Sequence, residues 1–142
     1  MSRYLSYAGV LVAMLFLTAG ARLSLAQEEQ ILARGQVHYQ RYCSVCHGPQ
    51  GKGKGPLAEY LRITPTNLTQ ISKKNEGTFP FWRMYRIIDG REEIRGHGTR
   101  LMPIWGDEIR TDEKDALPKF QEDLVAGRIW QMLSYLQSLQ EK

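Results

Sequence analysis

The chain has 142 residues, a formal net charge of +4 and two cysteines. Arg3 and Arg22 account for two of the positive charges, so residues 27–142 carry +2, and no basic segment is interleaved with aromatic residues as in nucleic-acid-binding proteins. We therefore expect no nucleic acid among its partners, and two cysteines are too few for a disulfide-rich scaffold.

The first 26 residues are typical of an export signal. Arg3 forms a short basic region, residues 4–19 are an almost uncharged apolar run, and Ser24-Leu25-Ala26 resembles a cleavage site. The run is short for a membrane span. We expect a signal peptide at 1–26 and one small domain at 27–142. An uncleaved N-terminal anchor is the alternative, because Arg3 is a weak basic region.

Three helices are predicted in the rest of the chain. Residues 28–42 carry apolar and small residues at helical spacing, residues 79–89 form a second periodic segment that Gly90 ends, and 121–140 carries a long apolar stripe. The intervening segments are expected to be turns and loops at 47–56, 64–67 and 96–106, with at most a short helix at 57–61. No strand alternation is present, so the fold class is all-α.

Cys43-Ser44-Val45-Cys46-His47 is the most specific motif in the chain. C-x-x-C-H is the attachment pattern of a c-type haem, in which two thiols bind the porphyrin covalently and the adjacent imidazole binds the iron. A redox dithiol is disfavoured because no βαβ pattern surrounds the motif. A zinc site is disfavoured because His38 and His97 do not supply a second ligand pair. We expect one covalent haem c with iron, held by Cys43 and Cys46 and ligated by His47.

A low-spin electron carrier also needs a sixth iron ligand. Outside the export segment the candidates are Met84, Met102, Met132 and His97. Met84 and Met132 fall in predicted helices, where methionine commonly fills the core. Met102 lies in a loop before Pro103, and thioether ligation raises the reduction potential. We predict Met102 as the second metal ligand, with His97 or an open position as the alternatives.

The chain resembles a class I monohaem cytochrome c of the bacterial, exported type over nearly all of residues 27–142. The resemblance rests on C-S-V-C-H with the following G-P-Q-G-K-G-K-G-P, and on Leu101-Met102-Pro103-Ile104-Trp105, which is similar to the methionine-ligand loop of that family. It implies a small cytochrome c fold with helices wrapped around one covalent haem. The N- and C-terminal helices are expected to cross where Gly35 and Tyr39 meet Tyr135 and Leu136.

The resemblance assigns roles to further residues. Pro56 occupies the place whose carbonyl accepts the Nδ1 proton of the haem histidine, which would fix its tautomer, and Trp105 is expected in the cofactor-binding set. His97 is expected either to hydrogen-bond a propionate or the methionine loop, or to be an exposed loop residue. The segment 107–121 is acidic and is longer than the corresponding link in compact members of the family. It is expected to be either a partner-specific flap or a solvated loop.

These features predict a periplasmic one-electron carrier that is not itself an enzyme. It would act free or as the cytochrome subunit of a dehydrogenase or respiratory complex, between a redox protein donor and acceptor. Residues 50–100 carry ten lysines and arginines against five acids, which form either a docking face or ordinary solvated charge. Membrane contact is expected only if the N-terminal segment is retained. The alternative function is a haem peroxidase or ligand-binding sensor with an exchangeable distal position.

Overall fold

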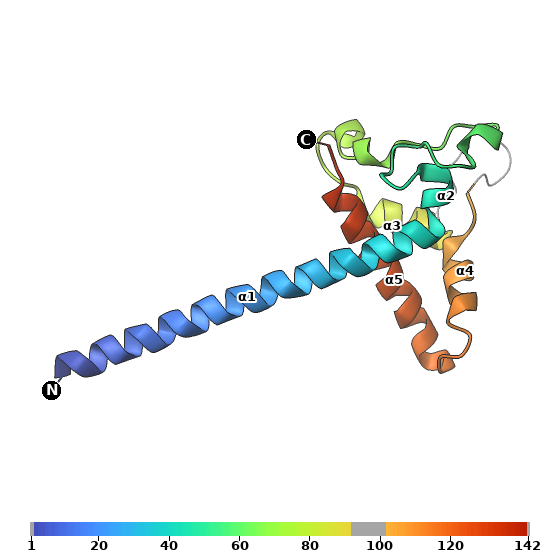
Figure 1. The fold of residues 1–142 in the computed structure, drawn as a ribbon. Helices are drawn as coiled ribbons and strands as arrows, with labels where there is room; N and C mark the ends of the chain where they lie inside the picture. Colours follow the sequence, from blue (N-terminus) through green and yellow to red (C-terminus); the bar gives the residue numbers. More distant parts are fainter. Residues whose placement is uncertain (1, 92–101, 142) are drawn as a thin grey trace. The chain divides into compact units, whose positions relative to one another are not determined.

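The computed structural model of the chain describes residues 2–91 and 102–141, with side chains from Arg22 onward. All regular structure in these ranges is helical, which confirms the predicted all-α class. The chain divides into two compact units, Met1–Ile31 and Leu32–Lys142, each described by itself (Figure 1). Among the described residues, no helix is long and apolar enough to cross a membrane.

The long helix α1 extends from Ser2 to Tyr42, so it contributes to both units. The predicted helix at 28–42 is confirmed, but α1 begins much earlier than expected. Residues 4–26 contain no proline and only isolated glycines, so nothing in this stretch interrupts the helical hydrogen-bond pattern. The part of α1 that belongs to the second unit begins at Leu32.

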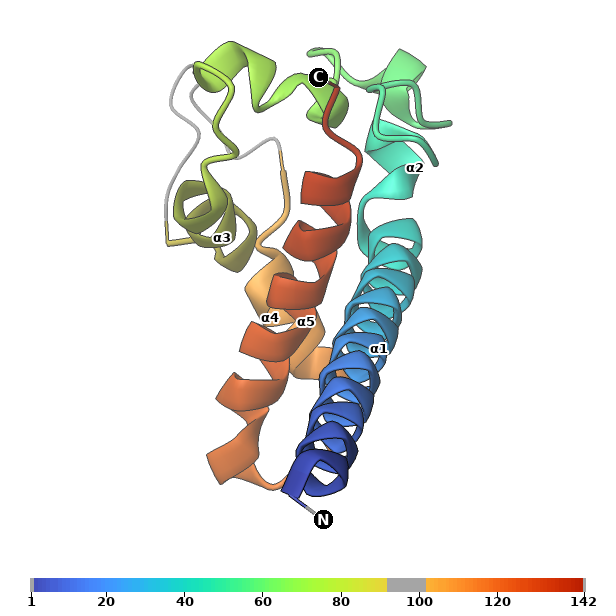
Figure 2. The same ribbon diagram turned by 90° about the vertical axis from the view of Figure 1, so that its left-hand side faces the viewer.

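The second unit is built from the end of α1 and seven shorter elements. In chain order they are α2 (Ser44–His47), η1 (Ala58–Tyr60), η2 (Leu68–Gln70), η3 (Lys73–Asn75), α3 (Phe81–Asp89), α4 (Trp105–Asp112) and α5 (Pro118–Ser138). α3 and α4 pack against α5 and against each other, and Figure 2 shows α4 running alongside α5. The core of this unit therefore forms where these helices meet the end of α1.

Local sequence signals explain the ends of α3 and α5. Gly90 ends α3 in the left-handed conformation at φ 92°, and its N–H donates to the Arg86 carbonyl, as predicted for a glycine stop. Pro118 occupies the first turn of α5, where its missing N–H costs nothing. The last helix thus begins three residues before the predicted start and ends at Ser138.

The segment after Met102 differs most from the sequence prediction. Residues 96–101 lie outside the described residues, but Trp105–Asp112 is a helix rather than an irregular segment, and most of its polar residues are exposed. Its buried residues are Gly106 and Ile109, and the Ile109 side chain is fully buried. Because α4 has few apolar residues, its sequence shows only a weak helical periodicity. Asp107 and Glu108 in the first turn nevertheless favour a helix start at this point.

The crossing of α1 and α5 is confirmed. Gly35 lies directly against the main chain of Gln131, and the Tyr39 ring lies 5.5 Å from the Tyr135 ring. The buried hydrophobic residues around this contact form one cluster, made of Tyr39, Tyr42, Cys43, Leu68, Ile88, Ile109, Val125, Ile129, Met132, Leu133 and Leu136. Cys43 belongs to this cluster, so the C-x-x-C-H motif is attached directly to the buried core of the domain.

Candidate haem site

Ser44–His47 of the C-x-x-C-H motif form α2, a single helical turn that Cys43 connects to α1. The glycine-rich loop that follows folds back on this turn. The N–H groups of Gly53, Gly55 and Leu57 donate to the carbonyls of His47, Cys46 and Val45, at 2.8, 3.0 and 2.9 Å. The loop therefore satisfies the free carbonyls at the end of α2 and acts as scaffolding for the motif.

A cavity of about 880 Å³ lies beside the motif. It is lined by Cys43, His47, Thr66, Leu68, Ile71, Lys74, Asn75, Pro80, Arg83, Met84, Ile87, Ile88, Arg91, Met102 and Leu136. The structure thus brings Cys43 and His47 to one cavity with Met102, which is distant from them in the sequence. Cys46 belongs to α2 as well, and it is half-buried.

The His47 ring has a defined hydrogen-bond partner. Its Nδ1 lies 2.9 Å from the carbonyl oxygen of Thr66. The prediction that the Pro56 carbonyl accepts this bond is therefore wrong. The hydrogen bonds that Gly55 and Leu57 make to α2 hold Pro56 in an exposed turn, whereas the segment at Thr66 reaches the imidazole.

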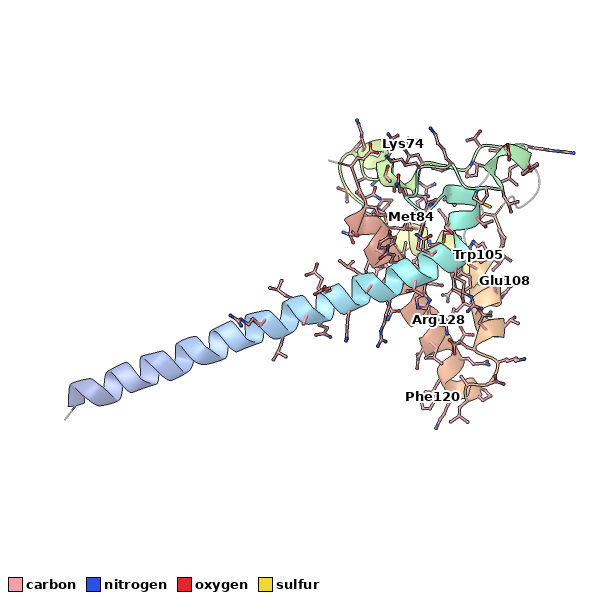
Figure 3. All side chains as sticks on the ribbon, viewed as in Figure 1. Lys74, Met84, Trp105, Glu108, Phe120 and Arg128 are labelled. Carbon is pink, nitrogen blue, oxygen red and sulfur yellow. The ribbon has the colours of Figure 1, made fainter. Side chains whose placement is uncertain are left out.

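Trp105, which the sequence assigns to the cofactor-binding set, packs against the end of α1. Among the described residues that line the cavity Trp105 is absent, and its ring packs 5.7 Å from the Tyr42 ring instead. It is the first residue of α4, and Figure 3 shows it beside the end of α1. α4 turns the tryptophan toward Tyr42, and its place in the cofactor-binding set stays a prediction.

The protonation of the motif fits metal binding. Burial lowers the pKa of His47, while its hydrogen bond to Thr66 acts in the opposite direction. A neutral imidazole is the form that ligates a metal, and a carbonyl partner on Nδ1 leaves Nε2 as the ligand atom.

The two thiols do not fit a redox dithiol. Neither forms a disulfide, and burial, with a smaller contribution from Cys46, raises the pKa of the Cys43 thiol to about 12. A reactive C-x-x-C cysteine needs a lowered pKa so that the thiolate forms. A neutral, covalently modified sulfur is compatible with this buried position, and therefore attachment of a cofactor fits better than thiol exchange.

The wall of the cavity carries charges that sequence reasoning did not single out. Lys74, Arg83 and Arg91 line it, and no acidic residue is among its described lining residues. Arg91 also pairs with Asp89. The propionate groups of a haem are anionic, so this basic wall suits them. The excess of lysine and arginine between residues 50 and 100 was the signal that could have indicated these positions.

The candidate sixth ligands differ in whether they line the cavity. Met84 on α3 and Met102 both line the cavity, whereas Met132 is fully buried in the core and is absent from the described lining residues (Figure 3 labels Met84). His97 lies outside the described residues. The sequence predicts Met84 to fill the core, but its side chain lines the cavity. Met84 is therefore a second thioether that needs to be tested against Met102.

Comparison with known proteins agrees with this site. The family model described as "Cytochrome C oxidase, cbb3-type, subunit III" matches residues 30–120, which is more than half of the chain and includes Cys43, Cys46, His47 and Met102. Searches among curated proteins and among solved structures give no match. The chain therefore belongs to this family of cytochrome c domains, and its cofactor is one covalently bound c-type haem with iron.

Proposed function

We propose that the protein is an exported one-electron carrier with His47 and Met102 as the axial ligands of its haem iron. The observation that carries the proposal is the shared cavity, which an imidazole and a thioether from two distant segments line together. The family supports a haem-based electron carrier in general. The ligand pair is the finer statement, and it rests on the chemistry of the two side chains.

Each ligand has a distinct part in this proposal. The carbonyl of Thr66 orients the His47 ring and increases its basicity through Nδ1. The sulfur of Met102 is soft and neutral, so it favours ferrous iron and raises the reduction potential. When bound, the haem supplies the one-electron couple. The protein holds both ligands in place during oxidation and reduction, which keeps the structural reorganisation small.

We propose that the domain works in the periplasm. Cytochrome c domains are usually exported, and residues 1–26 carry the features of a signal peptide. Cleavage after Ala26 would release a soluble domain of residues 27–142, and a retained segment would act as an anchor. N-terminal sequencing of the protein purified from the periplasm distinguishes the two, since the processed form begins at Gln27.

Redox partners are implied by the family in general. We propose a separate electron donor and acceptor, with a dehydrogenase as a candidate donor. Such encounters bury little surface and dissociate quickly. The basic residues between 50 and 100 would steer acidic partners toward the domain, so the rate of electron transfer should fall as the ionic strength rises.

The experiment that tests the proposal combines haem stoichiometry with ligand binding. The haem should stay attached in denaturant, at one per chain, and the ferric protein should be low-spin and should bind cyanide only slowly. Replacement of Cys43 and Cys46 by alanine should abolish covalent attachment. A high-spin ferric spectrum that changes rapidly with cyanide would overturn the carrier assignment and favour a peroxidase or ligand sensor.

A further inference from the structure

Helix α4 begins two residues after Pro103, so its position determines where the Met102 segment leaves the cavity. The start of the helix is closely packed. The Trp105 ring lies 5.7 Å from the Tyr42 ring, and a Cβ atom on Gly106 would lie 2.7 Å from the Asp89 carbonyl oxygen. The start of α4 is therefore held against both α1 and the end of α3.

The other end of α4 is held by hydrogen bonds. The carboxylate of Asp112 accepts a hydrogen bond from the Tyr42 hydroxyl and one from the Arg41 guanidinium, the latter at 2.9 Å. The Tyr42 hydroxyl in turn accepts a hydrogen bond from Arg128 of α5 at 3.2 Å. Arg128 also pairs with Glu113, the residue directly after α4. This end is thus connected to α1 and α5 at once.

Tyr42 contacts both ends of α4. Its ring packs on Trp105 and its hydroxyl bonds to Asp112, and these two residues lie two helical turns apart on one face. Ile109 occupies the same face between them and is fully buried. Tyr42 is itself buried and directly precedes Cys43. One side chain therefore links the covalent attachment point to the helix that follows Met102.

We propose that Tyr42 and Asp112 are positioning residues that hold Met102 at the cavity through α4. The inference rests on the proposed ligation by Met102. A methionine ligand on a loop competes with an open form in which the segment moves away. Contacts that fix α4 disfavour the open form, because Met102 would have to leave the cavity while α4, which begins three residues later, stays in place.

Added imidazole measures this competition directly in the haem-loaded full chain. It binds ferric iron only when Met102 has left, so its apparent affinity reports the population of the open form. Loss of one hydrogen bond to the charged Asp112 should increase that population at least about fivefold. We expect Tyr42→Phe, which keeps the ring contact with Trp105, to tighten imidazole binding by at least this factor. Asp112→Ala also loses the hydrogen bond from Arg41, so it should tighten binding at least as much.

Asp115→Ala is the matched control, because it removes the same charge from an exposed residue just beyond α4. It should leave imidazole binding unchanged. If Asp112→Ala fails to fold, Tyr42→Phe still decides the question. If both variants lower the unfolding temperature but bind imidazole as the wild type does, the two residues stabilise the fold without positioning Met102, and the inference is wrong.

Failure of the proposed function has a different signature. In that case the wild type would either lack the long-wavelength absorption band of methionine-ligated ferric haem or keep it through Met84, and in both cases Met102→Ala would bind imidazole no more tightly than the wild type. A positive result for the inference requires the band in the wild type, tighter binding in Met102→Ala, and an intermediate effect in Asp112→Ala.

Discussion

The Nδ1 atom of His47 lies 2.9 Å from the carbonyl oxygen of Thr66, and this contact fixes the orientation of the imidazole. The next residue, Asn67, holds the Thr66 segment in place. Its side chain caps η2 by accepting hydrogen bonds from the N–H and hydroxyl of Thr69, at 3.0 and 2.7 Å. The backbone conformation that points the Thr66 carbonyl at His47 therefore depends on the Asn67 cap.

Asn67→Ala should weaken the bond to His47 and raise the reduction potential, because a less basic imidazole stabilises ferric iron less. The shift should be on the order of 30 mV, since about 59 mV corresponds to a tenfold change for one electron. Loss of the cap should also lower the free energy of unfolding by about 1 kcal/mol. Pro56→Ala is the control in the same redox titration, and a larger shift in Pro56→Ala than in Asn67→Ala would contradict the assignment.

Gly35→Ala should destabilise the domain, because its Cβ atom would collide with the Gln131 main chain where α1 and α5 cross. Overpacking of this kind costs about 1–3 kcal/mol. Gly127→Ala is a matched control inside α5, where no atom lies within 4 Å of the added Cβ. That variant should gain about 0.5–1 kcal/mol from helix propensity. Chemical denaturation of both variants tests the crossing, and equal stabilities would show that the helices do not touch there.

The stability of the domain should depend on pH through His38. Burial, and next the charge of Arg128, lower the pKa of His38 below 6.5 in the folded state. The unfolded chain then binds more protons as the pH falls below about 6.5, so folding stability decreases down to the folded-state pKa and is constant below it. His38→Gln should remove this part of the slope of unfolding free energy against pH. If the slope of unfolding free energy against pH is unchanged in His38→Gln, another titratable group causes the pH dependence.

The fold class and the covalent motif could be predicted because they depend on local patterns. C-S-V-C-H fixes the attachment chemistry, and Gly90 ends α3 where the sequence indicated. Gly35 also revealed its role in advance, since a glycine inside a periodic helix indicates a close approach by another element. These features share one property, which is that the residue type alone restricts the conformation or the chemistry.

The features that were missed depend on how distant segments meet. The sequence does not show whether Pro56 or Thr66 reaches His47, because the path of the glycine-rich loop decides it. The sequence does not predict helix α4, because few of its residues are buried and the polar contacts at its end come from Tyr42 and Arg128 on other helices. The direction of the Trp105 ring is also set by α4, so the sequence does not show that this ring packs on Tyr42.

The most direct test of the His47 and Met102 assignment compares Met102→Ala with Met84→Ala, since both methionines line the cavity. The measurement is the ferric absorption spectrum together with the reduction potential of each haem-loaded variant. We predict that Met102→Ala loses the long-wavelength methionine band and has a lower potential, while Met84→Ala keeps the band and nearly the wild-type potential. Loss of the band in Met84→Ala, or its retention in Met102→Ala, would contradict the account.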